Sequence, residues 1–98
     1  MTSGRLDDVI QALSEAGASL RCNEMRSVLV SLGFDVRDGR KPGHKVVTHR
    51  YIEGFFSTSY TCGHGKNPEV KPAYVRRIRN TLRTYYQQLS DYLGDEQQ

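Results

Sequence analysis

Two segments near the N-terminus carry apolar residues at the i, i+3, i+4, i+7 spacing of an amphipathic helix. The first segment predicts a helix from about Arg5 to Ala16, which ends at Gly17. The second predicts a helix that begins at Cys22 or Asn23 and ends before Gly33. The apolar positions behind these two patterns are Leu6, Val9, Ile10 and Leu13 in the first segment and Met25, Val28, Leu29 and Leu32 in the second.

Farther along the chain the pattern changes to the alternation that is typical of β-strands. It predicts three short strands, over residues 34–37, 44–49 and 55–61. The residues expected on the buried face of the third strand are Phe56, Tyr60 and Cys62. The strands pair antiparallel, because the connections between them are too short for a parallel crossover.

The last element is the most regular one. A single apolar stripe predicts one long helix from Lys71 or Pro72 to Leu93. The stripe consists of Val75, Ile78, Leu82, Tyr85, Leu89 and Tyr92. The elements together predict an α+β fold in the order α-α-β-β-β-α. We expect residues 1–98 to form one two-layer domain, with helices packed on one face of a three-stranded antiparallel sheet and the other face free.

The composition of the 98-residue chain is that of a globular protein, with 37% hydrophobic and 26% charged residues. No apolar run approaches the ~20 residues that cross a bilayer, and the first residues do not resemble a secretory signal. We therefore expect no contact with a membrane. The two cysteines, Cys22 and Cys62, are too few for a disulfide framework. This predicts a cytoplasmic protein with two reduced thiols.

The net charge of +3 is distributed unevenly along the chain. Residues 71–83 contain five basic side chains and no acidic one, and residues 37–50 contain five basic side chains against Asp38 alone. The acidic residues lie mostly near the two ends of the chain. This distribution predicts a localised positive surface that suits an anionic partner, and an ordinary solvated face is the alternative.

Among the histidines, His44 has the setting best suited to chemistry. It follows a glycine-containing turn, opens a strand and lies close in sequence to Lys41 and Lys45. Imidazole transfers protons near neutral pH and lysines hold phosphate, so this group of residues suits a phosphodiester. RNA is the more natural substrate, because its 2′-hydroxyl can act as an internal nucleophile without a metal. A strand-end histidine without a chemical role is the alternative.

A zinc site is the competing use of these residue types. Cys62 and His64 are close in sequence, and His44 and His49 could approach them across the sheet. However, residues five positions apart on a strand point to opposite faces, and the chain has no second cysteine pair. The carboxylates do not gather around the histidines either. We expect no metal and no cofactor.

A second stripe on the last helix consists of Arg76, Arg79 and Arg83. These arginines could follow a phosphate backbone. They would equally pair with the acidic residues of a partner protein, or keep the long helix hydrated. The tyrosines of this helix fall on or beside its apolar stripe, so we expect them to pack rather than to stack on bases.

The order of these motifs resembles that of the HicA toxins, the small ribonuclease-type members of bacterial toxin–antitoxin pairs. The resemblance covers residues 22–83, and the segments 1–21 and 84–98 extend beyond it. HicA toxins usually carry Gly-Ser-His where this chain has Pro42-Gly43-His44. The matching features are a short helix that runs into Leu32-Gly33-Phe34, a basic turn that ends in Gly43-His44, a strand with Val46-Val47, a strand that leads to His64, and a helix opened by Lys71-Pro72 that carries Val75, Arg77 and Ile78.

The resemblance implies a fold similar to a double-stranded RNA-binding domain. It also implies metal-independent cleavage of RNA, with His44 as the catalytic histidine, and a cognate HicB-like antitoxin protein that covers the site. On this hypothesis the open sheet face binds the RNA. The expected nucleic-acid-binding residues are Lys41, Lys45, His64, Arg76, Arg77 and Arg79.

Two other functions stay open at this point. The same charge pattern, together with the altered turn before His44, fits a nucleic-acid-binding module without catalysis. Alternatively, the long helix predicted from Val75 to Leu93 fits a protein-interaction adaptor, in which it provides a partner surface or the contact of a homodimer.

Overall fold

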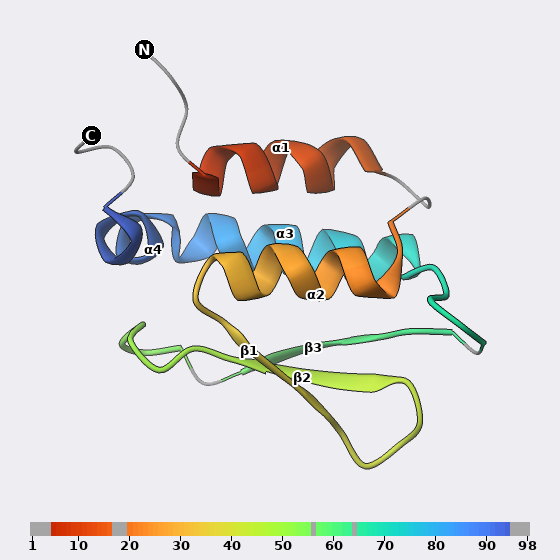
Figure 1. Ribbon diagram of the computed structural model, residues 1–98. Helices are drawn as coiled ribbons and strands as arrows, with labels where there is room; N and C mark the ends of the chain where they lie inside the picture. Colours follow the sequence, from red (N-terminus) through yellow and green to blue (C-terminus); the bar gives the residue numbers. More distant parts are fainter. Residues whose placement is uncertain (1–4, 17–19, 56, 64, 95–98) are drawn as a thin grey trace.

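The computed structural model describes residues 5–16, 20–55, 57–63 and 65–94. Within them the α+β class and the three-stranded antiparallel sheet are confirmed. No helix in these segments is long and apolar enough to cross a membrane. The elements, shown in Figure 1, are α1 (Arg5–Ala16), α2 (Cys22–Ser31), β1 (Asp35–Asp38), β2 (His44–Thr48), β3 (Thr58–Thr61), α3 (Pro72–Thr84) and α4 (Tyr86–Leu93).

The sheet has the order β1-β2-β3, so β2 is the central strand. Val36 pairs with Val47, and both are buried under the helices. His44 pairs with Thr61. Because side chains alternate along a strand, His44 stands on the face opposite to Val47. Figure 1 shows α2 and α3 on the first face, and none of the described helices covers the second, which we call the open face.

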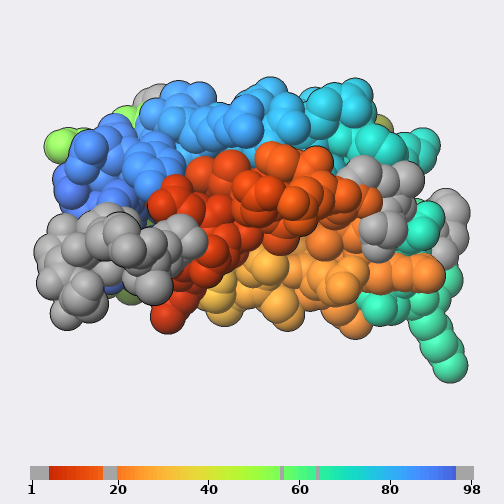
Figure 2. Space-filling model, turned by 90° about the horizontal axis from the view of Figure 1, so that it is seen from above, coloured from red at the N-terminus to blue at the C-terminus, as the bar shows by residue number. Residues whose placement is uncertain are grey.

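Helix α1 lies on the far side of α2 and α3 from the sheet (Figure 1). Seen from above, it fits between these two helices (Figure 2). The helices therefore form two layers of their own, whereas one helical layer was predicted. The reason is that the apolar stripe of α1 packs mainly against α3 rather than against the sheet. Its buried residues are Leu6, Val9 and Leu13.

The prediction of one continuous helix up to Leu93 is wrong, because α3 and α4 are separated at Tyr85. The Tyr85 hydroxyl lies 3.3 Å from a backbone carbonyl of the β2–β3 loop. The neighbouring Tyr86 hydroxyl donates a 2.6 Å hydrogen bond to Asp7 of α1. Adjacent tyrosines thus anchor the chain to two different elements. The apolar periodicity, which continues to buried Leu89, gives no sign of this break.

Strand β3 begins at Thr58, later than predicted. Phe55 instead packs edge-on against two aromatic rings of the core, with centroid separations of 5.3 and 5.7 Å. The expected buried face of this strand is confirmed for Tyr60 and Cys62. Phe56, which was expected on the same face, lies outside the described residues.

The two cysteines form a disulfide, so the prediction of reduced thiols is wrong. Cys22 is the first residue of α2, and Cys62 directly follows β3. Their Cα atoms are 5.8 Å apart although 40 positions separate them in the chain. Closing a loop of this length stabilises the folded chain by about 4 kcal/mol in the chain-entropy model. Only the tertiary structure brings the two thiols together.

Candidate active site on the open sheet face

The turn between β1 and β2 is built to present His44. The backbone N–H of Gly39 donates a 2.7 Å hydrogen bond to the His44 carbonyl, and the His44 N–H donates one of 3.1 Å to the Lys41 carbonyl. A side chain at Gly39 would collide with the imidazole, so glycine at this position lets the ring lie against the backbone. Gly43 has a φ of +81°, in the left-handed region that glycine adopts readily.

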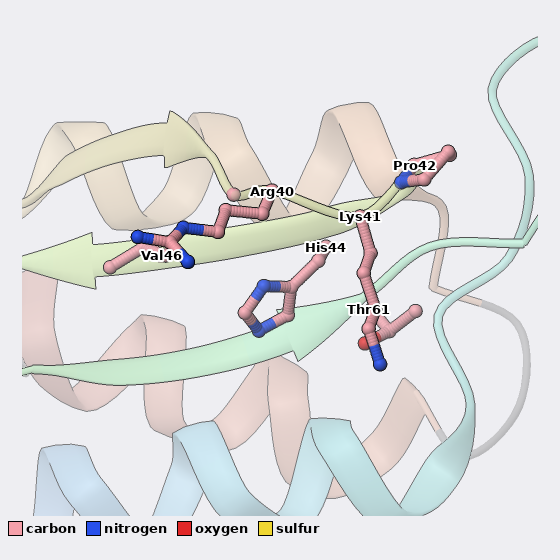
Figure 3. Close-up of a pocket in the computed structure, with 7 residues that line it drawn as sticks. Arg40, Lys41, Pro42, His44, Val46 and Thr61 are labelled. Atoms are coloured by element: carbon pink, nitrogen blue, oxygen red, sulfur yellow. The ribbon is translucent and has the colours of Figure 1, made fainter.

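The imidazole of His44 lies in a pocket of about 580 Å³ on the open face. In Figure 3 the ring lies over the gap between β2 and β3, with Lys41 and Thr61 on one side, while Arg40 extends along β2 toward Val46. Among the described residues that line the pocket, none carries a carboxylate. The lining residues are Gly39, Arg40, Lys41, Pro42, His44, Val46 and Thr61.

Lys45 does not belong to this pocket. Its Nζ lies 2.5 Å from Oδ1 of Asp38, and its strand partner is buried Tyr60. It therefore points to the side of the sheet opposite to His44. The hydrogen bond and the charge of Lys45 hold the pKa of Asp38 below its usual value. The structure brings Lys41 next to His44 but gives Lys45 a different partner.

The arginines predicted to bind RNA do not lie together. Arg77 donates a 3.2 Å hydrogen bond from Nη1 to the Ser59 hydroxyl, at the edge of the sheet formed by β3. Its guanidinium carbon also lies 5.1 Å from the centroid of the Tyr74 ring. Successive helical residues are rotated by about 100°, so Arg76 and Arg79 leave α3 in other directions than Arg77. Of the three arginines, Arg77 is the one with a contact to the sheet among the described residues.

His49 is buried on the helix side of the sheet. Its Nε2 lies 3.1 Å from the Leu32 carbonyl, and its Nδ1 accepts a 3.2 Å hydrogen bond from the Tyr51 N–H. These contacts place the ring proton on Nε2. Burial lowers the pKa of His49 below its usual 6.5, although the Leu32 hydrogen bond and the charge of Asp35 act in the opposite direction. His49 is a neutral packing residue.

The residues considered for zinc are not assembled into a site. Within the described part of the chain, no three His, Cys, Asp or Glu side chains are placed to hold a metal ion. Cys62 is bonded to Cys22, and His44 and His49 lie on opposite faces of the sheet. His64, predicted as a nucleic-acid-binding residue, lies outside the described residues.

The site also contains residues that were not predicted. Arg40, Val46 and Thr61 line the pocket, and Arg37 is the strand partner of Val46 on the same face. Arg40 could have been predicted as a site residue from the sequence, because it lies in the same basic turn as Lys41. Thr61 and Arg37 depend on the pairing register of the strands, which the sequence does not show.

Comparison of this chain with protein-family models, with curated proteins and with solved structures finds no match. We therefore infer what the pocket can do chemically from its geometry alone. The His44 imidazole can act as an acceptor and a donor in proton transfer. Arg40 and Lys41 can hold a phosphate group. Val46 and Pro42 offer apolar surface against which a sugar or base can lie.

Proposed function

We propose that this protein is an RNA-binding endoribonuclease toxin of a toxin–antitoxin pair. The observation that carries the proposal is the position of the His44 imidazole in an open-face pocket beside Arg40 and Lys41. A proton-transfer group next to two phosphate-binding cations suits the cleavage of a phosphodiester. The HicA-like order of motifs supports the same function, together with a fold similar to a double-stranded RNA-binding domain.

In the proposed reaction the nucleophile comes from the RNA. His44 takes the proton of a 2′-hydroxyl, and the 2′-oxygen attacks the adjacent phosphorus. The bond from phosphorus to the 5′-oxygen of the next nucleotide breaks, and that oxygen takes a proton from the imidazolium or from water. Arg40 and Lys41 offset the negative charge that develops on the phosphate. The products are a 2′,3′-cyclic phosphate and a 5′-hydroxyl, and no metal takes part.

Positive side chains also flank the pocket along the open face. Arg37 stands beside Val46 on β1, and Arg77 reaches the edge of β3. We propose that these two arginines hold the RNA backbone on either side of His44, so that binding is sensitive to salt. Lys45, Arg76 and Arg79 face elsewhere and act on the RNA only at longer range.

The same proposal includes a partner and a compartment. A HicB-like antitoxin protein covers the open face and blocks the pocket. The protein acts in the cytoplasm, where the disulfides that do occur are mostly transient or redox-sensing. The bond between Cys22 and Cys62 would be open to reduction there.

A second candidate is an RNA-binding module without catalysis. The observation in its favour is the turn Pro42-Gly43-His44, which lacks the serine hydroxyl usual in HicA toxins. The adaptor alternative stays an untested prediction, and the single long helix on which it was based is divided at Tyr85 into α3 and α4.

Expression in bacteria tests the proposal. Wild type, His44→Ala and Thr48→Ala are induced in parallel, and growth and total RNA integrity are followed together. Thr48 is the matched control, because it lies on the open face of the same strand but outside the pocket. We expect growth arrest and RNA loss with wild type and Thr48→Ala, and neither with a folded His44→Ala.

Purified protein separates the two candidates. We expect wild type to cut an RNA oligonucleotide and to leave 2′,3′-cyclic phosphate ends, and to leave the 2′-deoxy analogue intact. His44→Ala should bind this RNA with unchanged affinity but not cut it. Intact RNA after incubation with folded, antitoxin-free wild type would contradict the ribonuclease proposal, and salt-sensitive binding in the same sample would support the binding module.

A further inference from the structure

The disulfide lies one residue away from the proposed active site. Thr61 lines the pocket and pairs with His44, and Cys62 follows it directly in the chain. The other half of the disulfide, Cys22, begins α2 in the helical layer. The bond therefore ties the end of strand β3, next to the pocket, to a helix on the covered face of the sheet.

The backbone of Cys62 also holds the turn that precedes His44. Its N–H donates a 2.8 Å hydrogen bond to the Gly43 carbonyl. A Cβ atom at Gly43 would lie 2.5 Å from the Cys62 carbonyl oxygen, so the two backbones are in close contact. The Gly43 carbonyl belongs to the peptide unit that ends at the His44 nitrogen. A displacement of the Cys62 backbone would therefore also displace the backbone of Gly43 and the imidazole of His44.

Noncovalent contacts at this end of β3 would survive without the disulfide. The strand is an edge strand with β2 as its neighbour in the sheet. Cys62 forms an isolated bridge with buried Val70, and the Val70 N–H donates a 2.8 Å hydrogen bond to Leu20. The Cys22 N–H donates a 2.7 Å hydrogen bond to Pro68. These contacts keep the segment near α2, so breaking the disulfide loosens the turn rather than removing it.

We propose that the Cys22–Cys62 disulfide is a redox control of the His44 pocket. The oxidised form holds Cys62, and with it the Gly43–His44 turn, in the arrangement that supports cleavage. The reduced form relaxes the turn and lowers the cleavage rate. The effect on catalysis rests on the ribonuclease function proposed above, whereas the coupling between the disulfide and the turn can be measured without RNA.

The switch needs a protein dithiol of the thioredoxin class as reductant. One thiolate of the dithiol attacks a sulfur of the Cys22–Cys62 bond, forms a mixed disulfide and releases the other cysteine. The second thiol of the reductant then displaces the remaining cysteine. Two electrons and two protons pass to Cys22 and Cys62, and the reductant becomes a disulfide. Both cysteines are nearly buried, so exchange requires local opening at this edge strand.

Nuclear magnetic resonance of the whole chain tests the coupling. Spectra are recorded for the oxidised protein, for the protein treated with dithiothreitol, and for the double variant Cys22→Ala/Cys62→Ala. We expect reduction to shift the backbone resonances of Gly43, His44 and Thr61 and to add slow exchange at these positions. The double variant should show the same changes and should not respond to dithiothreitol.

Leu13→Ala is the control for a general loss of stability, since Leu13 is buried in α1, a helix that α2 and α3 separate from the sheet (Figure 1). It should leave the resonances of Gly43 and His44 in place. Changes limited to the immediate neighbours of the two cysteines, or equal changes in Leu13→Ala, would overturn the proposed coupling.

RNA cleavage by the same samples completes the test. We expect the reduced protein to cleave RNA at least about fivefold more slowly than the oxidised protein. Equal rates would overturn the redox control even where the resonances move. If the oxidised protein does not cleave RNA, the ribonuclease proposal fails, and the resonances at Gly43 and His44 still decide whether the disulfide controls the turn.

Discussion

The ammonium group of Lys45 contacts the carboxylate of Asp38 across the first two strands, on the side of the sheet opposite to the imidazole of His44. The side chain of Lys45 is 20% exposed and that of Asp38 is 78% exposed, so the ion pair is open to solvent on its Asp38 side. Lys41 has a different environment, because it lines the pocket beside His44. Two lysines with similar positions in the sequence therefore have different roles.

Substitution of these two lysines should separate the roles. In the His44→Ala background, which prevents cleavage, we expect Lys41→Ala to weaken RNA binding and to reduce the slope of log affinity against log salt by about 1. Lys45→Ala should reduce that slope much less, because its charge is directed at Asp38 and acts on the RNA only at longer range. Fluorescence anisotropy with a labelled oligonucleotide over a range of salt concentrations measures both. Equal slopes for the two variants would contradict the pocket assignment.

Replacing Gly43 should damage the site more than replacing a glycine of the same conformation elsewhere. Gly43 and Gly54 have φ values of +81° and +83°, but only a Cβ at Gly43 meets another atom, the Cys62 carbonyl oxygen at 2.5 Å. We expect Gly54→Ala to cost about 1–2 kcal/mol of unfolding free energy, from backbone conformation alone. Gly43→Ala should cost more and should also reduce RNA cleavage. Urea unfolding and cleavage assays decide this, and similar behaviour of the two variants would refute it.

His49 should make the protein less stable in mild acid. Burial lowers its pKa below the 6.5 of the unfolded chain, so the unfolded state binds a proton more readily than the folded state. Its contribution to stability is complete above the unfolded pKa and is lost as the pH falls below it. We expect the melting temperature to drop between about pH 7.5 and pH 5.5. The melting temperature of His49→Gln should fall less over this pH range. An equal fall in both proteins would show that groups other than His49 cause it.

Removal of the buried Tyr60 hydroxyl and of the partly buried Tyr86 hydroxyl should have different effects on stability. The Tyr60 hydroxyl is buried and has no hydrogen-bond partner among the described residues, and burial raises the pKa of Tyr60 to about 12. We expect Tyr60→Phe to leave the unfolding free energy unchanged or to raise it by about 1 kcal/mol. The Tyr86 hydroxyl donates a hydrogen bond to Asp7, so Tyr86→Phe should lower the unfolding free energy by about 1–3 kcal/mol. Chemical denaturation of both variants measures this, and a loss in Tyr60→Phe would indicate a partner for its hydroxyl.

The parts of the fold that depend on local periodicity were predictable. The bounds of α1 agree with the prediction from Arg5 to Ala16, and α2 begins at Cys22, one of the two predicted positions. The antiparallel pairing of the strands followed from short connections that exclude a crossover. The break at Tyr85 was not predictable, because the apolar periodicity continues through it, whereas the hydroxyls of Tyr85 and Tyr86 contact distant parts of the chain.

The candidate site was predictable only in part. Local sequence identified His44 and Lys41 through the basic glycine turn that carries them. Strand alternation also separates Lys45 from His44, because adjacent residues of a strand point to opposite faces of the sheet. Thr61 required the register of β3 on β2.

Residue order alone specifies α1, α2, the first two strands and the turn that carries His44, because each depends on neighbours within a few positions of the chain. Packing in three dimensions places Thr61 beside His44, joins Cys22 to Cys62 and directs Arg77 to the edge of the open face. These relationships connect residues that are far apart in the chain. The free energy that stabilises these long-range contacts comes from burial of the whole core, so no local sequence pattern predicts them.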